Sequence, residues 1–169
     1  DRLRGLGLNP WTDARGNLCN AFLYAADDRA CGVHLVFDGK VILGTRARKT
    51  CTKSYNAFSS IDHPAVAEIR DRRIIFFVPE RVTAERPDFY LQLNPRVFVY
   101  KLIPGADPQI FEFLKAHYDA LVIESFGVGG IPCYENERFI EAIEDWINSG
   151  RTVVMATQVP HEGSDMSVY

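Results

Sequence analysis

The sequence predicts an α/β protein with a mixed first half and a second half built on a parallel sheet. Three observations predict this class. Two strand-forming runs, at 33–37 and 41–43, flank Asp38-Gly39, a strong hairpin signal. Several prolines lie between residues 79 and 95 and separate the two halves. Beyond them, strand-like runs at 97–100, 120–123 and 152–156 alternate with two helical patterns, the order typical of a parallel sheet with helices packed on it.

Composition places the chain among ordinary globular proteins. It has 169 residues, of which 47% are hydrophobic and 24% charged, enough for one domain or two small ones. The net charge of -3 gives no bulk attraction to nucleic acid or to an anionic membrane. No apolar run is long enough to span a bilayer as a helix. The four cysteines form no C-x-x-C pair, so we expect reduced thiols, no metal site and no cofactor.

In the first half, residues 1–11 follow no clear period and are expected to form an extended loop. Thr12-Asp13 is a plausible start for a helix that runs to about Ala26. Its apolar face should consist of Leu18, Ala21, Phe22 and Ala25, which follow helical spacing. After the hairpin, residues 65–69 are predicted to form a short helical turn, and 73–78 a buried strand.

In the second half, residues 79–95 are expected to form a linker or a long surface segment. Asp107 is predicted to cap a helix that has Pro108 at its first position. A second, strongly amphipathic helix should follow the middle strand and end at Gly150. Its apolar face is formed by Phe139, Ile140, Ile143, Trp146 and Ile147.

The stretch 44–58, Gly-Thr-Arg-Ala-Arg-Lys-Thr-Cys-Thr-Lys-Ser-Tyr-Asn-Ala-Phe, combines four cations with many hydroxyl groups. It shows no apolar periodicity, which predicts an ordered loop, a common place for chemistry. One interpretation is a lysine that activates a nucleophilic hydroxyl. The other is a solvated basic loop whose Ser and Thr residues form local turns. Cys51 lies within this stretch and is interpreted as a passive neighbour.

Two loops follow strands of the predicted parallel sheet, where ligands of such sheets bind. The first, 124–130, is glycine-rich, and Gly129 and Gly130 are candidates for contacting a carboxylate or phosphate through backbone N–H groups. A tight turn is the alternative, since the spacing is not that of a dinucleotide fingerprint. The second loop, 157–165, contains Ser164, His161 and Asp165, but no nucleophile elbow that would support a catalytic triad.

Three segments together resemble the L-asparaginase/amidohydrolase family in its cytosolic type I form. They are residues 12–22, residues 36–58, and the glycine loop 125–130 with its downstream strand and residues 163–169. The resemblance extends from about Thr12 to the last residue, and the middle segment is the most specific. It implies hydrolysis of L-asparagine to L-aspartate and ammonia by a threonine nucleophile, assisted by a second Thr, a Lys and an Asp. The catalytic lysine of the family falls on Lys49.

The resemblance also implies a domain division and a homo-oligomer in the cytoplasm, with L-asparagine as the small-molecule partner and without nucleic acid or membrane. Residues 1–85 would be the end of the larger N-terminal α/β domain, 86–95 a linker, and 96–169 most of the smaller C-terminal domain. The family stretches Thr-Gly-Gly-Thr-Ile and His-Gly-Thr-Asp-Thr belong upstream of residue 1. We therefore expect a fragment without the nucleophile, inactive by itself.

Two positions depart from the family pattern. Gly130 stands where many members have Asn, and Arg48 stands where the members regulated by asparagine have Thr, so that regulation is not implied. Two alternatives to an asparaginase remain. One is the amidase subunit of a tRNA-dependent amidotransferase, which a basic stripe would favour but this sequence lacks. The other is a non-catalytic α/β binding module. Substrate preference between asparagine and glutamine stays open.

Overall fold

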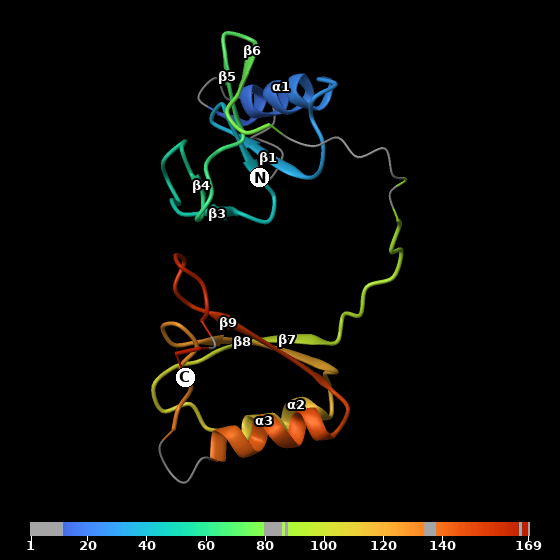
Figure 1. Cartoon of the computed structure of the whole chain (residues 1–169), viewed down its shortest axis with the longest axis vertical. Coiled ribbons are helices and arrows are strands. Elements are labelled where there is room, and N and C mark those ends of the chain that lie inside the picture. Colours follow the sequence, from blue (N-terminus) through green and yellow to red (C-terminus); the bar gives the residue numbers. More distant parts are fainter. Residues whose placement is uncertain (1–11, 80–85, 87, 134–137, 166, 169) are drawn as a thin grey trace. The chain divides into compact units, whose positions relative to one another are not determined.

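The computed structural model describes residues 12–79, 86, 88–133, 138–165 and 167–168. The predicted loop at 1–11 and part of the predicted linker lie outside these residues. The chain divides into two compact units, residues 1–87 and 88–169, each with its own sheet (Figure 1). Each unit is described below by itself.

The first unit packs one helix against an antiparallel sheet. The sheet has the strand order β1-β2-β5-β6, and β3 and β4 form a separate two-stranded hairpin. Its small core contains Tyr24 from the helix and Val41, Val66, Ala67 and Ile69 from the sheet region. The elements are α1 (Ala14–Ala25), β1 (His34–Phe37), β2 (Lys40–Leu43), β3 (Ala47–Lys49), β4 (Phe58–Ser60), β5 (Ala67–Arg70) and β6 (Arg73–Phe76).

Helix α1 confirms the predicted helix but not its predicted buried face. Leu18 and Phe22 are exposed, whereas Tyr24 is buried against the sheet and contacts His34 and Phe76 edge-on or tilted. The helical spacing of Leu18, Ala21, Phe22 and Ala25 was therefore a correct signal for the helix and a wrong signal for its orientation. Tyr24, which precedes Ala25 and was not part of the predicted face, is the residue of α1 that is buried in the core of this unit.

Two hairpin turns of the first unit place consecutive residues at positive φ. The predicted turn between β1 and β2 is confirmed, with φ of 49° at Asp38 and 73° at Gly39. A Cβ at Gly39 would lie 3.0 Å from the Ile69 carbonyl oxygen, so glycine is favoured there for space as well as for φ. The turn between β5 and β6 has the same form but uses Asp71 and Arg72, with φ of 49° and 61°.

Two further predictions for the first half were wrong. Residues 65–69 do not form a helical turn, because Ala67–Arg70 is strand β5, which pairs with β2 and β6. Its residues alternate between the core and the surface, a pattern too short to stand out in the sequence. The predicted buried strand at 73–78 is β6, an edge strand whose side chains alternate between exposed and half-buried.

The second unit confirms the predicted parallel sheet. Strand β8 (Ala120–Ser125) lies between β7 (Val97–Lys101) and β9 (Thr152–Thr157), and both pairings are parallel. Helices α2 (Ile110–Lys115) and α3 (Arg138–Asn148) lie together on one face of this sheet (Figure 1). Gly150 follows α3 with φ of 79°, as predicted for a helix C-terminus.

The core of the second unit lies between this sheet face and the two helices. Trp146 of α3 and Phe111 of α2 pack edge-to-face, with ring centroids 6.3 Å apart, over Leu121 and Ile123 of β8. Helix α2 begins later than predicted, at Ile110. Pro108 lies in the preceding turn, and the Asp107 carboxylate accepts a hydrogen bond from the Gln109 N–H at 2.9 Å.

The opposite face of the sheet is not covered by any helix among the described residues of this unit. Val97, Val99 and Val154 are exposed there, as the alternation along β7 and the strand register place them. Strand register places Lys101 beside Glu124 on the same face, and their charged groups lie 3.7 Å apart. This face is therefore apolar along β7 and β9 and carries one exposed ion pair.

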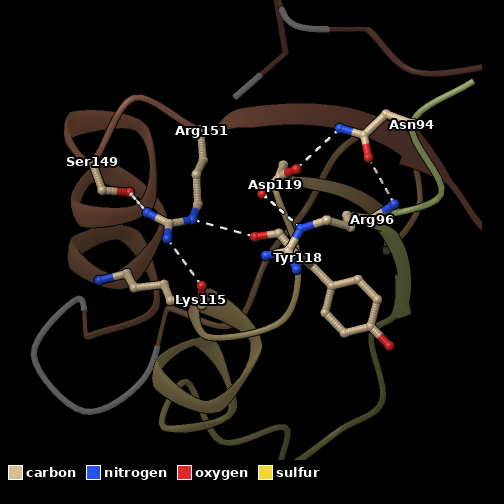
Figure 2. A network of polar contacts seen from close by, with 7 residues as sticks. All are labelled: Asn94, Arg96, Lys115, Tyr118, Asp119, Ser149 and Arg151. Atoms are coloured by element: carbon tan, nitrogen blue, oxygen red, sulfur yellow. Dashed lines mark hydrogen bonds and ion pairs between the residues drawn. The ribbon is translucent and has the colours of Figure 1, made fainter.

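The amino ends of the parallel strands are held by a network centred on two arginines (Figure 2). Arg151 donates hydrogen bonds to the carbonyl oxygens of Lys115 (2.9 Å) and Tyr118 (3.3 Å) and to Ser149 Oγ (2.7 Å). It thus connects the C-terminal ends of α2 and α3 to the start of β9. Asp119, before β8, accepts hydrogen bonds from Asn94 and from the Arg96 guanidinium, both at 3.1 Å.

Asp119 predicts a pH dependence of stability. Its hydrogen bonds from Asn94 and Arg96, with the Arg96 and Arg151 charges, lower its pKa below the ordinary value of 3.8. A lowered folded-state pKa stabilises the fold above the unfolded-state pKa, and this contribution is lost as pH falls through the folded-state value. We expect wild-type chain and Asp119→Asn to differ in free energy of unfolding at pH 6 and to converge towards pH 2 in urea titrations. A constant difference across this range would contradict the assignment.

Candidate functional site

The basic stretch is a loop between two short strands: Ala47–Lys49 is β3, Phe58–Ser60 is β4, and residues 50–57 between them form the predicted loop. Strands β3 and β4 pair in antiparallel register, with Ala47 opposite Ser60, Arg48 opposite Ser59 and Lys49 opposite Phe58. The Phe58 ring packs on Phe37 of β1, with centroids 4.9 Å apart, and so attaches the hairpin to the main sheet of its unit. Lys49 therefore stands on a paired strand, which fixes its backbone.

The end of β3 is held by a compact set of hydrogen bonds. The N–H groups of Thr50 and Cys51 both donate to the carbonyl oxygen of the buried Ala57, at 2.8 and 3.2 Å. The hydroxyl groups of Thr50 and Ser59 lie 2.8 Å apart and form a hydrogen bond across the hairpin. The residue that follows Lys49 is thus fixed by both its backbone and its side chain.

The side chain of Lys49 is exposed, and its Nζ lies 6.0 Å from the centroid of the Phe58 ring. Within the described part of the chain, this amine makes no hydrogen bond or ion pair. An amine without a partner, on a rigid strand, is available to take part in proton transfer with a group that approaches it. Cys51, next to Thr50, is a half-buried free thiol.

The glycine-rich loop 125–130 of the second unit forms a tight turn. The N–H groups of Gly129 and Gly130 both donate to the Phe126 carbonyl oxygen, at 3.0 and 2.7 Å, and the Phe126 N–H donates back to Gly130 at 2.8 Å. Gly129 has φ of 146°, a conformation that favours glycine. These hydrogen bonds occupy the two N–H groups that were candidates for ligand binding. A contact between this loop and substrate stays a prediction.

Side chains after β9 anchor the same turn at the carboxyl ends of the strands. The Thr157 hydroxyl donates to the Gly127 carbonyl oxygen, and the Asp165 N–H donates to that of Val128 at 2.8 Å. The Gln158 amide donates to the Leu102 and Glu124 carbonyl oxygens, at 2.5 and 3.0 Å. Gln158 therefore connects the ends of all three strands, and the turn rests on a fixed edge of the sheet.

In the polar loop after β9, the carboxylate of Asp165 is held by hydrogen bonds. Asp165 accepts hydrogen bonds from the Ser167 N–H (2.9 Å) and hydroxyl (2.6 Å), and these lower the pKa of Asp165 below its usual value. This geometry gives Asp165 a turn-forming role through Ser167. The described residues hold no group of three or more His, Cys, Asp or Glu placed to bind a metal ion. Nor does any described helix have the length and apolar character needed to cross a membrane.

Comparison with known proteins gives the family. Residues 8–81 match the family model described as asparaginase, N-terminal, and residues 96–169 match the glutaminase/asparaginase C-terminal domain. The chain belongs to the asparaginase family. The predicted resemblance and fold class are thereby confirmed, and Lys49 and the glycine turn lie in the N-terminal and C-terminal family domains, respectively.

Individual relatives agree with this assignment. The chain is 31% identical over 160 residues to the L-asparaginase of Thermococcus kodakarensis, covering 95% of this chain and 48% of the relative. A solved structure of the thermostable L-asparaginase from that organism superposes with a TM-score of 0.87, covering 96% of this chain and 48% of that one. A glutamyl-tRNA(Gln) amidotransferase subunit from Methanopyrus kandleri is 29% identical over 175 residues, covering 95% of this chain and 37% of the relative. The chain thus spans about half or less of the length of these relatives.

Sequence reasoning missed the partners that hold Lys49 in place. Ser59, Phe58 and Ala57 were included in or next to the basic stretch, but nothing marked them as the opposite strand. The available signal was the pair Phe58 and Ile61, two strand-forming residues that follow a polar turn. The role of Gln158 was also missed, since its hydrogen bonds to the Leu102 and Glu124 carbonyl oxygens depend on the parallel register.

Proposed function

We propose that this chain belongs to an L-asparagine amidohydrolase, which converts L-asparagine to L-aspartate and ammonia. In this proposal a threonine hydroxyl attacks the side-chain amide carbon, and Lys49 activates that threonine within a Thr-Lys-Asp array. The amide C–N bond breaks with release of ammonia, and water then hydrolyses the acyl-enzyme ester to aspartate. The threonine lies in the part of the family pattern that residues 1–169 do not match.

The observation that carries the proposal is the setting of Lys49. Lys49 lies in the family-matched segment and on a strand paired with β4, and the N–H group of the next residue, Thr50, donates to Ala57. The amine of Lys49 has no hydrogen-bond partner among the described residues. A general base needs a fixed backbone and a free lone pair directed at its substrate proton. The neighbouring cations Arg48 and Lys53 have no such family match.

The test uses ammonia release from L-asparagine, with L-glutamine for comparison. We assay the 169-residue chain and a chimera in which its residues 12–169 replace the aligned segment of the Thermococcus kodakarensis L-asparaginase. We expect release from the chimera and none from the 169-residue chain, because the threonine would come from the relative. A folded chimera without activity would contradict the proposal. Release by the chain itself would place the nucleophile within these residues and refute the family mechanism.

A second candidate is supported by the relatives that are named as subunits of glutamyl-tRNA(Gln) amidotransferases. In that function the same amide hydrolysis would supply ammonia to a partner protein. The lower identity, 29% against 31%, gives it less support. Stimulation of ammonia release by glutamyl-tRNA(Gln) and a partner amidotransferase subunit would favour this candidate, whereas release from free L-asparagine alone favours the first.

We also propose the domain division, the cellular location and the oligomeric state that the resemblance implies. The family matches at 8–81 and 96–169 support an N-terminal domain ending near residue 85, a linker at 86–95 and a C-terminal domain from 96. The four free cysteines support a cytoplasmic location. A homo-oligomer, and a substrate contact from the Gly129–Gly130 turn, rest on the resemblance alone.

A further inference from the structure

Ser60, on the strand opposite Lys49, has a buried hydroxyl group that the mechanism above does not use. Its Oγ is shielded from solvent and has no hydrogen-bond partner among the residues that the structure describes. Buried hydroxyl groups are nearly always paired, because loss of hydration without a replacement bond is unfavourable. A partner is therefore expected close to this position on the hairpin.

The strand register places Ser60 and Lys49 on the same face of the hairpin. Opposed residues of an antiparallel pair point to one face, and successive residues alternate. Ala47, Lys49, Phe58 and Ser60 consequently share a face, while Arg48 and Ser59 lie on the other. The hydrogen bond between Ser59 and Thr50 agrees with this division, since Thr50 is two residues from Arg48.

On the shared face, Lys49 and Ser60 are diagonal neighbours. Diagonal Cβ atoms in such pairs are about 7–8 Å apart or less, within reach of a lysine side chain. The residue opposite Ser60 is Ala47, whose side chain is a single methyl group. The Nζ of Lys49 lies 6.0 Å from the centroid of the Phe58 ring, so a contact with Ser60 requires a different rotamer of the lysine side chain.

We infer that Ser60 is a positioning residue for Lys49: its Oγ accepts a hydrogen bond from the Nζ–H of the lysine. This inference rests on the proposed function for its catalytic meaning, but not for the contact itself. This hydrogen bond satisfies the buried hydroxyl group and holds the amine at one place on the hairpin. Ser60 touches neither substrate nor nucleophile and acts only through Lys49.

The contact is tested in the 169-residue chain by NMR of lysine side-chain nitrogens labelled with ¹⁵N. A hydrogen bond slows exchange of the amine protons with water, so we expect slower exchange at Lys49 than at Lys53, which lies beyond the end of β3. Ser60→Ala should remove this difference, and Ser60→Thr, which keeps the hydroxyl, should retain it. The Lys49 signal being the same in Ser60→Ala as in the wild type would overturn the inference, and would indicate that water satisfies Ser60.

The consequence for catalysis is tested in the active chimera. Ser60→Ala should lower kcat about tenfold, the rate equivalent of one neutral hydrogen bond, with KM changed less than about twofold. Ser60→Thr should restore kcat. In a Lys49→Ala background, Ser60→Ala should cause no further loss, because its effect acts through the lysine. Unchanged kcat in Ser60→Ala, with Lys49 essential, refutes the positioning role alone; a chimera without activity refutes the proposed function and leaves the NMR result to decide the contact.

Discussion

In the active chimera, Lys49→Met is expected to lower kcat by about 10²–10⁴-fold, the range for loss of a positioned general base. Methionine keeps much of the length and apolar character of the lysine stem, and the side chain is exposed, so the fold should persist. The backbone of the hairpin is held by Ala57 and by the pairing with β4, neither of which depends on the amine. Steady-state ammonia release measures the effect.

The matched control is Lys53→Met, which makes the same chemical change at an exposed position beyond the end of β3. We expect its kcat to stay close to that of the unsubstituted chimera. Equal loss of activity in the two variants would show that activity depends on the positive charge of the stretch and not on the Lys49 amine in particular. Near-normal turnover in Lys49→Met would remove this residue from the mechanism. Circular dichroism distinguishes either result from unfolding.

The largest stability effect is expected for Trp146→Ala, at about 3–5 kcal/mol in the free energy of unfolding. Trp146 is completely buried and packs on Phe111, and the Arg151 guanidinium lies over its ring, 5.6 Å from the centroid. Its indole N–H also donates to the Thr152 carbonyl oxygen at 3.1 Å, which would lose this partner. Alanine would leave a cavity where α3 meets the sheet. Urea unfolding followed by circular dichroism measures the loss.

Ile147→Ala serves as its control, because the next residue of the same helix is 52% exposed. Trp and Ile have similar helix propensities, so the difference in the loss of unfolding free energy between the two variants reports the burial of Trp146. The control should lose about 1 kcal/mol or less. Similar unfolding midpoints for the two variants would show that α3 does not pack through Trp146.

The parallel sheet of the second unit could be predicted because long apolar strands alternate with a strongly amphipathic helix. In the first unit, the strands are too short for the same pattern to be recognised in the sequence. Strand β5 places only Ala67 and Ile69 in the core, too few residues for a clear two-residue period. The face of α1 was misassigned because Leu18 and Phe22 are exposed, whereas the half-polar Tyr24 fills the core.

The candidate site was found by resemblance and not by pattern. Lys49 lies on a strand whose cationic residues, Arg48 and Lys49, are both exposed, so no alternation of apolar residues marks it. Its pairing with β4 depends on a contact across a polar turn, which single-sequence reasoning cannot place. Likewise, the N–H groups of Gly129 and Gly130 looked available until the turn geometry showed that both bind Phe126.

The two turns at positive φ have different implications for engineering. In the β1–β2 turn, the second residue at positive φ is Gly39, which has no side chain to strain. In the β5–β6 turn, the equivalent position is Arg72, with φ of 61°. A non-glycine residue in this region carries about 1 kcal/mol or more of conformational strain. The exposed Arg72 at the tip of this hairpin therefore lowers the stability of the fold. Arg72→Gly is therefore a natural first substitution for raising the thermal stability of this protein, and it lies outside the β3–β4 hairpin that carries Lys49.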